Sequence, residues 1–353
     1  MNKVDLLDAR TIGTRPDSLI SPLPFDADGG IRTKYLVTGA TGFIGGRIAR
    51  ALVADGHQVI AIARDPSRAR DLRALGVQVR PGDVTIAESV WGPMMGVDGV
   101  FHVAGWYKIG AAGRAEAEKI NVEGTRNVLT AMKELRIRKG VYTSTLAVFS
   151  DTHGALVDET VRPDGKGPWL TEYDRTKWAA HYEVAEPMIR EGLPLVIVEP
   201  GVNYGPGDTS EIRPLLVRYL RRRLRALPKE TAYCWAHVDD TARGHLLAME
   251  KGVPGETYIL AGPPHSLIEA FQIAERITGI RAPRLNVSPR LLRFMARLAR
   301  SERLRVGAGV TYLGSNEKAR RVLGYEPRSL EAGLRETLAY EMRLLGMAAP
   351  KKG

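Results

Sequence analysis

The stretch Gly39-Ala-Thr-Gly42-Phe-Ile-Gly45 directly follows the apolar run Tyr35-Leu-Val-Thr38. The apolar run predicts a β-strand, and apolar residues at helical spacing from Gly42 to Asp55 predict a helix. The first glycine allows a tight turn, the second lets a ligand approach the backbone, and the third lets helix and strand pack closely. Because a helix N-terminus placed in this way binds phosphate groups, the stretch predicts a dinucleotide-binding turn. Its candidate residues are Gly39, Thr41, Gly42, Phe43, Ile44 and Gly45.

Beyond this turn, apolar runs typical of strands alternate with helical patterns. This alternation favours a parallel sheet with helices on both faces, and right-handed crossovers make such a sheet doubly wound. We therefore predict an α/β fold with a doubly wound parallel Rossmann sheet. The predicted strands are 57–63, 77–80, 99–104, 141–143, 195–199 and 257–260, and the predicted helices are 115–134, 171–191 and 237–251.

The composition is that of a soluble globular protein, with 44% hydrophobic and 26% charged residues in a chain of 353. No uncharged run approaches the ~18 residues that a membrane span requires, so no span is predicted. The single cysteine, Cys234, excludes an intrachain disulfide framework and a multi-cysteine zinc site. We expect a cytoplasmic protein without a bound metal.

The chain carries a formal net charge of +11, from 51 basic and 40 acidic residues. The densest basic cluster, Arg218–Arg225, has apolar residues at helical spacing, so we interpret it as the solvated face of a helix. Contact with an anionic substrate is the alternative. No zinc-finger spacing or RNA-binding signature occurs, so no nucleic-acid partner is expected. The stretch Leu291–Leu298 is too short to span a membrane, although surface binding through a basic amphipathic helix is an option.

Cofactor choice in such a site is determined at the end of the second strand, where an acidic residue hydrogen-bonds the ribose 2′-hydroxyl of NAD. The expected acidic position is Ala63, and Arg64 follows it. A guanidinium binds a 2′-phosphate through paired hydrogen bonds, so NADP is favoured. Asp65 provides the alternative, because a shift in register would bring its carboxylate to the ribose hydroxyl of NAD.

A tyrosine and a lysine share one helix face in Tyr173-Asp-Arg-Thr-Lys177. With the glycine-rich turn far upstream, this pair resembles the extended short-chain dehydrogenase/reductase family, within the NAD-dependent epimerase/dehydratase superfamily. The resemblance extends over about residues 33–340. Phe101-His-Val-Ala-Gly105 and Arg64-Asp-Pro66 are most similar to the dihydroflavonol reductase-like branch.

The resemblance implies a hydride-transfer enzyme in which Tyr173 transfers a proton at the substrate oxygen. A free phenol titrates near ~10, and the ammonium group of Lys177 would lower that pKa and hydrogen-bond the nicotinamide ribose. Alignment with the family pattern places the third catalytic hydroxyl at Thr145, with the adjacent Ser144 as the alternative. Asn121 matches a helix asparagine that relays protons through water to the lysine.

Further cofactor contacts are implied by the same resemblance. Asp83-Val84 resembles the pair whose carboxylate holds the adenine, with a turn-forming role for Asp83 as the alternative. Val103-Ala104-Gly105 resembles the stretch beside the ribose and pyrophosphate. Pro200, Val202 and Asn203 lie in a loop that resembles Arg-Pro-x-x-Val-Tyr-Gly-Pro-Gly beside the nicotinamide, although Glu199 replaces the arginine.

The expected organisation is a dinucleotide-binding domain followed by a smaller C-terminal lobe that binds the substrate. The family resemblance also makes a homodimer possible. The expected boundaries are 1–32 for an irregular arm, 33–203 for the Rossmann domain with contributions from about 236–262, 204–345 mainly for the substrate lobe, and 346–353 for a tail.

We expect an NADP-dependent oxidoreductase that reduces a small-molecule ketone or aldehyde to an alcohol. The alternatives are a nucleotide-sugar epimerase or dehydratase with tightly bound NAD, a 3β-hydroxysteroid dehydrogenase-like enzyme, and a dinucleotide-binding protein without turnover. The substrate would be selected by the loops at 106–114, 151–170 and 203–235. Candidate substrate contacts, which core packing explains equally well, are Trp106, Tyr107, Trp169, Tyr204 and Trp235.

Overall fold

A seven-stranded parallel sheet is the central element of the computed structural model, which describes residues 33–107 and 113–348. The strand order is β10-β6-β5-β4-β1-β2-β3, so the direction of winding reverses between β1 and β4. Ligands of doubly wound sheets bind beyond the carboxyl ends of the strands at this reversal. The predicted fold class is confirmed. The strands are β1 (Lys34–Thr38), β2 (Gln58–Ala63), β3 (Gln78–Pro81), β4 (Gly99–His102), β5 (Lys139–Thr143), β6 (Leu195–Pro200) and β10 (Thr257–Leu260).

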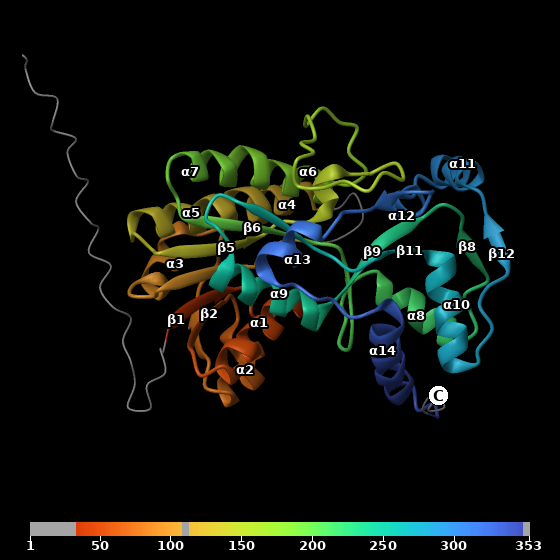
Figure 1. The fold of residues 1–353 in the computed structure, drawn as a ribbon, viewed down its shortest axis with the longest axis horizontal. Helices are drawn as coiled ribbons and strands as arrows, with labels where there is room; N and C mark the ends of the chain where they lie inside the picture. Colours follow the sequence, from red (N-terminus) through yellow and green to blue (C-terminus); the bar gives the residue numbers. More distant parts are fainter. Residues whose placement is uncertain (1–32, 108–112, 349–353) are drawn as a thin grey trace, which may run out of the picture. The chain divides into compact units, whose positions relative to one another are not determined.

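Helices cover both faces of this sheet (Figure 1). Each helix turns an apolar stripe towards the strands, and the two resulting cores account for most of the buried aliphatic side chains. One face carries α1 (Phe43–Ala54), α2 (Arg70–Ala74), α9 (Val238–Lys251) and α13 (Glu317–Leu323). The other carries α3 (Ala87–Met94), α5 (Gly124–Glu134), α6 (Glu172–Ala179) and α7 (Glu186–Arg190).

Two of these helices contain a π-helical segment. The first runs from α4 (Arg114–Ala117) through the π segment η2 (Glu118–Glu123) into α5. The second runs from α6 through the π segment η4 (Ala180–Ala185) into α7. Together they match the helices predicted over 115–134 and 171–191. Such π segments are rare and are often found at functional sites.

A smaller part of the molecule is built around a third core, in which strand β9 (Ala232–His237) is central. Strand β9 pairs with β7 (Val202–Tyr204), β11 (Pro264–Ser266) and β13 (Thr311–Tyr312), and β8 (Ala226–Pro228) pairs with β12 (Leu285–Val287). The helices of this part are α8 (Ile212–Leu220), α10 (Leu267–Thr278), α11 (Pro289–Ala299), α12 (Glu302–Val306) and α14 (Leu330–Leu344).

The helix predicted through the basic cluster Arg218–Arg225 ends earlier than expected. Helix α8 stops at Leu220, and Arg222 has the left-handed backbone conformation, with a φ of 55°. The chain reverses there so that Leu227 of β8 can enter the third core. The prediction of one continuous helix was therefore wrong, although the arginines from Arg221 to Arg223 are exposed.

Several expectations fall outside the described residues. They concern the irregular arm at 1–32, residues 349–353 of the tail, and positions 108–112 of a predicted substrate loop. Across the ranges that the structure does describe, no helix combines the length and apolar character needed to cross a membrane.

An ion pair between α8 and α14 provides a test of packing in the smaller part. Arg213 Nε lies 2.7 Å from Oε1 of Glu341, whose carboxylate is buried. Replacing Arg213 with methionine leaves that buried charge without this partner. We expect the free energy of unfolding, measured by urea denaturation, to fall by about 2–4 kcal/mol.

A matched control is the exposed pair Lys133–Glu191, which has the same 2.7 Å separation. Lys133→Met is expected to cost less than about 1 kcal/mol, because water screens this pair. The double variant Arg213→Met/Glu341→Met should recover most of the loss. Equal losses in the two single variants would show that burial of Glu341 does not determine the energy of its ion pair.

Candidate functional site

The glycine-rich turn between β1 and α1 lies against the end of β4. Gly39 has a φ of +70°, and a Cβ there would lie 2.7 Å from the amide nitrogen of Ala104. A Cβ at Gly45 would lie 2.3 Å from the carbonyl oxygen of Gly39, so neither position accepts a side chain without movement. Thr41 and Gly42 are exposed where α1 begins, and that first helical turn contains no acidic residue. The turn is therefore shaped to receive an anionic group at a helix N-terminus.

The hydroxyl of Thr38 fixes the end of β4. It accepts hydrogen bonds from the amides of Val103 and Ala104, each at 3.1 Å, and lies 2.8 Å from Nδ1 of His102. The hydroxyl proton is therefore donated to Nδ1, and the Nε2–H of His102 is directed to Thr125 at 3.0 Å. Burial, together with the charge of Lys177, lowers the pKa of His102 to about 3, so the ring is neutral. These amide bonds also explain why β4 ends at His102 rather than at the predicted residue 104.

Arg64 and Asp65 differ in their surroundings at the end of β2. Arg64 is exposed and is the first residue after the strand. Asp65 caps a short 3₁₀ turn, η1 (Pro66–Ala69), and accepts hydrogen bonds from the amide of Ser67 at 3.0 Å and its hydroxyl at 2.6 Å. These two bonds lower the pKa of Asp65. The Asp65 carboxylate is thus hydrogen-bonded within its own turn, and both side chains are exposed.

Asp83 and Val84 follow β3. The Asp83 carboxylate accepts a 2.9 Å hydrogen bond from the amide of Thr85, and its amide donates to Ser89 at 2.9 Å. This is the turn-forming arrangement that the sequence left open for Asp83. Val84 is buried, and its carbonyl accepts a bond from Asn127 at 2.9 Å.

Tyr173 and Thr145 come together where α6 begins. Thr171 caps this helix, accepting a 3.1 Å hydrogen bond from the amide of Asp174. Tyr173 follows in the first turn and is half-buried. The ring of Tyr107 is edge-on to its ring, with the two ring centroids 4.9 Å apart. Burial raises the pKa of Tyr173 to about 12, and a hydrogen bond with the hydroxyl of Thr145 opposes this rise. The phenol is therefore protonated at neutral pH in the chain by itself.

Lys177 is buried one helical turn further along α6. Its Nζ donates hydrogen bonds to the carbonyl oxygen of Thr143 at 2.7 Å and to the hydroxyl of Tyr142 at 3.0 Å. Burial lowers its pKa to about 7, because these partners are neutral and water is excluded. Neither partner was predicted. Both partners are the last residues of β5, the predicted strand that ends just before Thr145, and this position was the sequence signal for them.

Ser144 faces the opposite way from Thr145. Its hydroxyl lies 2.9 Å from Nδ1 of His181, which in turn lies 3.3 Å from Oε1 of Glu199. All three side chains are buried, so this group belongs to the interior. Of the two hydroxyls that the sequence proposed, Thr145 is the one beside Tyr173.

Asn121 lies in the π segment η2 and joins two elements of the site. Its Oδ1 accepts a 2.7 Å hydrogen bond from the amide of Trp106, and its Nδ2 donates to the hydroxyl of Thr176 at 2.9 Å. Gly105 packs against the same amide group, since a Cβ there would lie 3.4 Å from Oδ1. Asn121 thus ties the segment after β4 to α6 through Thr176, the residue directly before Lys177.

The segment after β6, predicted as a loop, contains strand β7 and is also held by α9. Pro200 ends β6, and Asn203 Oδ1 accepts a 2.7 Å hydrogen bond from the hydroxyl of Thr241 on α9. The Nδ2 group of Asn203 donates to the carbonyl of Gly201 at 3.1 Å. Val202 between them is half-buried. Asn203 therefore has a local structural role.

The predicted aromatic contacts divide into two groups. Trp106, Tyr204 and Trp235 are buried, and the last two belong to the third core. Trp169 is half-buried and Tyr107 is exposed. Only the second group has surface available for a substrate.

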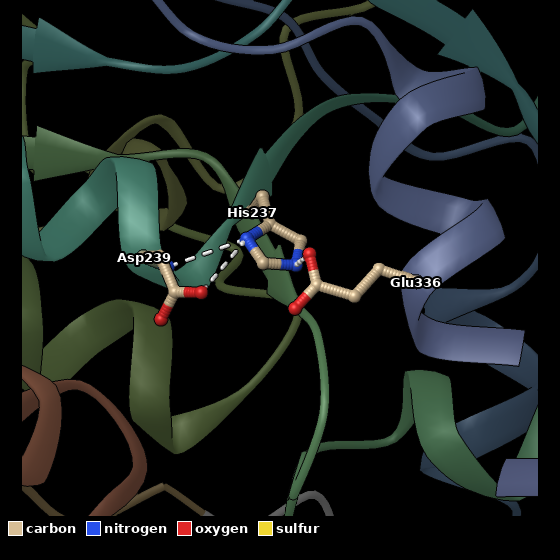
Figure 2. Close-up of side chains that lie close together, drawn as sticks. All are labelled: His237, Asp239 and Glu336. Carbon is tan, nitrogen blue, oxygen red and sulfur yellow. Dashed lines mark hydrogen bonds and ion pairs between the residues drawn. The ribbon is translucent and has the colours of Figure 1, made fainter. Parts of the chain in front are cut away.

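His237, Asp239 and Glu336 converge beside the N-terminus of α9, with their ligand-type atoms within 4.8 Å of one another (Figure 2). Nδ1 of His237 accepts a 3.4 Å bond from the amide of Asp239, so the neutral ring carries its proton on Nε2, which faces Glu336 at 3.7 Å. Arg47 pairs with Asp239 at 3.2 Å, and Arg328 pairs with Glu336 at 2.8 Å. This donor set favours ion pairing over metal binding, because the imidazole lone pair is engaged and arginines neutralise both carboxylates.

Comparison with known proteins agrees with the fold and the motifs. The model of the NAD dependent epimerase/dehydratase family matches residues 35–261. A putative dihydroflavonol 4-reductase of Synechocystis sp. is 34% identical over 263 residues, covering 72% of this chain and 75% of that protein. A 4-hydroxy-2-methyl-3-oxo-4-farnesyl-3,4-dihydroquinoline-1-oxide ketoreductase of Stigmatella aurantiaca is 33% identical, covering 84% and 92% of the two chains.

Among solved structures, a nucleoside-diphosphate-sugar epimerase from Pseudomonas aeruginosa superposes with a TM-score of 0.74 at 26% identity. The match covers 89% of this chain and 98% of the epimerase. Reductases and epimerases thus both occur among its relatives. The family match covers more than half of the chain and includes the glycine-rich turn, Tyr173 and Lys177. The chain belongs to the NAD dependent epimerase/dehydratase family, the extended short-chain dehydrogenases/reductases.

Proposed function

We propose that this protein is an NADP-dependent reductase that converts a ketone or aldehyde to an alcohol. The observation that carries the proposal is the pairing of Tyr173 with Thr145, one turn from the buried Lys177, beside the reversal point of the sheet. The ketoreductase and the putative dihydroflavonol 4-reductase among the relatives support a carbonyl substrate.

The residues of the chain fit a dinucleotide. The glycine turn at Gly39 and Gly45 leaves space that a side chain would fill, and the exposed start of α1 adjoins it. A bound nicotinamide dinucleotide supplies the hydride. Arg64, exposed after β2, would bind a 2′-phosphate, which favours NADP over NAD.

The acid–base chemistry belongs to the side chains at α6. Thr145 holds the substrate oxygen together with Tyr173, and Tyr173 donates its proton to that oxygen as the alcohol forms. The raised pKa of Tyr173 keeps the phenol protonated before reaction. Lys177, whose charge is weakly compensated by its neutral partners, then stabilises the phenolate that remains.

Tyr173→Phe tests the acid–base assignment. Removing the hydroxyl is expected to lower kcat for reduction of an active carbonyl substrate by about 10²–10⁴, while the Kd for NADPH is retained. Stopped-flow or steady-state loss of NADPH absorbance, with calorimetric titration of NADPH, measures both. The control is Tyr182→Phe on the same helical run, which should keep its turnover. Comparable turnover in Tyr173→Phe and wild type would exclude the proposed role.

Arg64→Ala tests the cofactor preference. Loss of the guanidinium should raise the Kd for NADPH by about 10–100-fold, in line with a charge-assisted contact worth roughly 1.5–3 kcal/mol, and leave the Kd for NADH nearly unchanged. Arg73→Ala, an exposed arginine on neighbouring α2, is the matched control. Tighter binding of NADH than NADPH in the wild type would contradict the preference for NADP. It would favour an epimerase or dehydratase with retained NAD.

Lys177 should make the stability of the cofactor-free protein depend on pH. Its pKa is about 7 in the folded chain and ~10.4 in an unfolded one. Between these values the unfolded chain binds the additional proton, so the free energy of unfolding rises with pH. Relative to Lys177→Met, we expect a rise of up to about 1.4 kcal/mol per pH unit between about pH 7 and 9.5.

Urea denaturation at several pH values measures this difference. Lys251→Met, at an exposed lysine, is the control and should follow the wild type. Parallel pH profiles for the wild type and Lys177→Met would mean that Lys177 stays charged in the folded protein.

A further inference from the structure

Helix α11 turns its apolar stripe away from the protein. Leu291, Phe294, Met295 and Leu298 stand at the i, i+3, i+4 and i+7 positions that normally face a core. They are instead 50%, 59%, 43% and 72% exposed. The buried residues of this helix are small, namely Pro289 and Ala296. The part of the chain that the structure describes therefore leaves the stripe largely uncovered.

The stripe stands out from the other exposed apolar side chains. Leu285 on β12, the strand that directly precedes α11, is 63% exposed and adds to the same region of the chain. Elsewhere in the described residues, large exposed apolar side chains such as Leu75 and Val253 occur one at a time along the sequence. Scattered exposure of that kind is normal in soluble proteins, whereas a concentrated set marks an interaction surface.

The sequence segment that carries the stripe has charges of one sign. No Asp or Glu occurs between Glu275 and Glu302, the segment that contains β12 and α11. Three arginines of α11 itself are exposed beside the apolar stripe. The arginines of the segment are Arg276, Arg281, Arg284, Arg290, Arg293, Arg297 and Arg300.

We propose that α11 is a membrane-surface helix that binds anionic lipid. Leucine, phenylalanine and methionine side chains would enter the boundary between headgroups and acyl chains, and the flanking arginines would pair with lipid phosphates. The helix would lie in the plane of the surface, which agrees with its eleven residues, too few to cross a bilayer. This proposal does not depend on the carbonyl-reductase function.

A second copy of the chain is a poorer occupant. In a two-fold contact the same patch faces itself, so the arginines beside one stripe would oppose those beside the other. Like charges placed together in an interface oppose association. An anionic surface complements both the apolar stripe and the charge.

The location of α11 gives membrane binding a consequence for the candidate site. Helix α12 follows α11 directly, and the guanidinium of Arg305 in α12 donates a hydrogen bond to the carbonyl oxygen of Leu170. Leu170 precedes the α6 cap and, through it, Tyr173. The proposed lipid-facing helix is therefore connected, through α12, to the segment that leads into the site.

Co-sedimentation of the full chain with lipid vesicles tests the proposal. We expect binding to phosphatidylcholine vesicles that contain phosphatidylglycerol, weaker binding to pure phosphatidylcholine, and release as salt screens the charges. Phe294→Ser/Leu298→Ser should lower the partition coefficient at least about tenfold, since each side chain loses apolar burial. Arg290→Gln/Arg297→Gln should lower it roughly ten- to thirtyfold for anionic vesicles only.

Two control variants separate this patch from bulk properties. Arg221→Gln/Arg223→Gln removes the same formal charge from the exposed cluster after α8, and Leu75→Ser/Val253→Ser removes exposed apolar side chains elsewhere. Both controls should bind as the wild type does. Unchanged melting temperatures in all four variants show that the fold is retained.

The proposal is overturned if the wild type does not bind anionic vesicles, or if the α11 variants and the controls bind equally. A third result would also overturn it. In that case sedimentation velocity shows a wild-type dimer, the Phe294→Ser/Leu298→Ser variant is a monomer, and the wild type does not bind vesicles. That last result would assign the stripe to a second copy of the chain.

Discussion

The close approach of the β1–α1 turn to the end of β4 is the constraint on which the candidate site depends. The backbone of Gly39 lies so near Ala104 that no side chain fits between them, and Gly45 lies equally close to the carbonyl of Gly39. The contact joins the two strands at which winding reverses and directs the start of α1 into the same space. The hydroxyl of Thr38 then satisfies both amides that follow β4. The backbone of the β1–α1 turn thus creates the space for a ligand and also directs the amide groups at the start of α1 into it.

Burial of Lys177 gives this site its electrostatic character. The ammonium group is bonded to a carbonyl and a phenol rather than to a carboxylate, so its charge is only partly compensated. A protein interior penalises such a charge, and the lowered pKa of Lys177 expresses that penalty. The same penalty raises the pKa of the neighbouring Tyr173. Burial therefore disfavours the charged form of both groups, and in the proposed reaction a phenolate at Tyr173 would compensate the charge of Lys177.

The sequence predicted those features that depend on short-range patterns. Strand and helix periodicity located the seven-stranded sheet. The extended backbone continues past β5 to Thr145, so the adjacent side chains of Ser144 and Thr145 point in opposite directions and could not both face Tyr173. Features that depend on packing between distant segments were not predicted. The partners of Lys177 come from a strand that precedes its helix by many residues, and α8 ends where Leu227 must enter a core. Helix α3 was missed because its single short run contains Pro93, which breaks the expected pattern.

The π segment of the α6–α7 run changes the helical phase between the part that carries Tyr173 and Lys177 and the part that follows. Each π turn accommodates an additional residue in its helix, so the helical phase after the segment differs from the phase before it. In the α6–α7 run, the half before η4 presents Tyr173 and Lys177, and η4 itself supplies Val184 and Ala185 to the core beneath the sheet. An uninterrupted α-helix would lock both faces into one rotational register. The insertion therefore lets the later part of this run turn its apolar side chains to the sheet without rotating Tyr173 and Lys177.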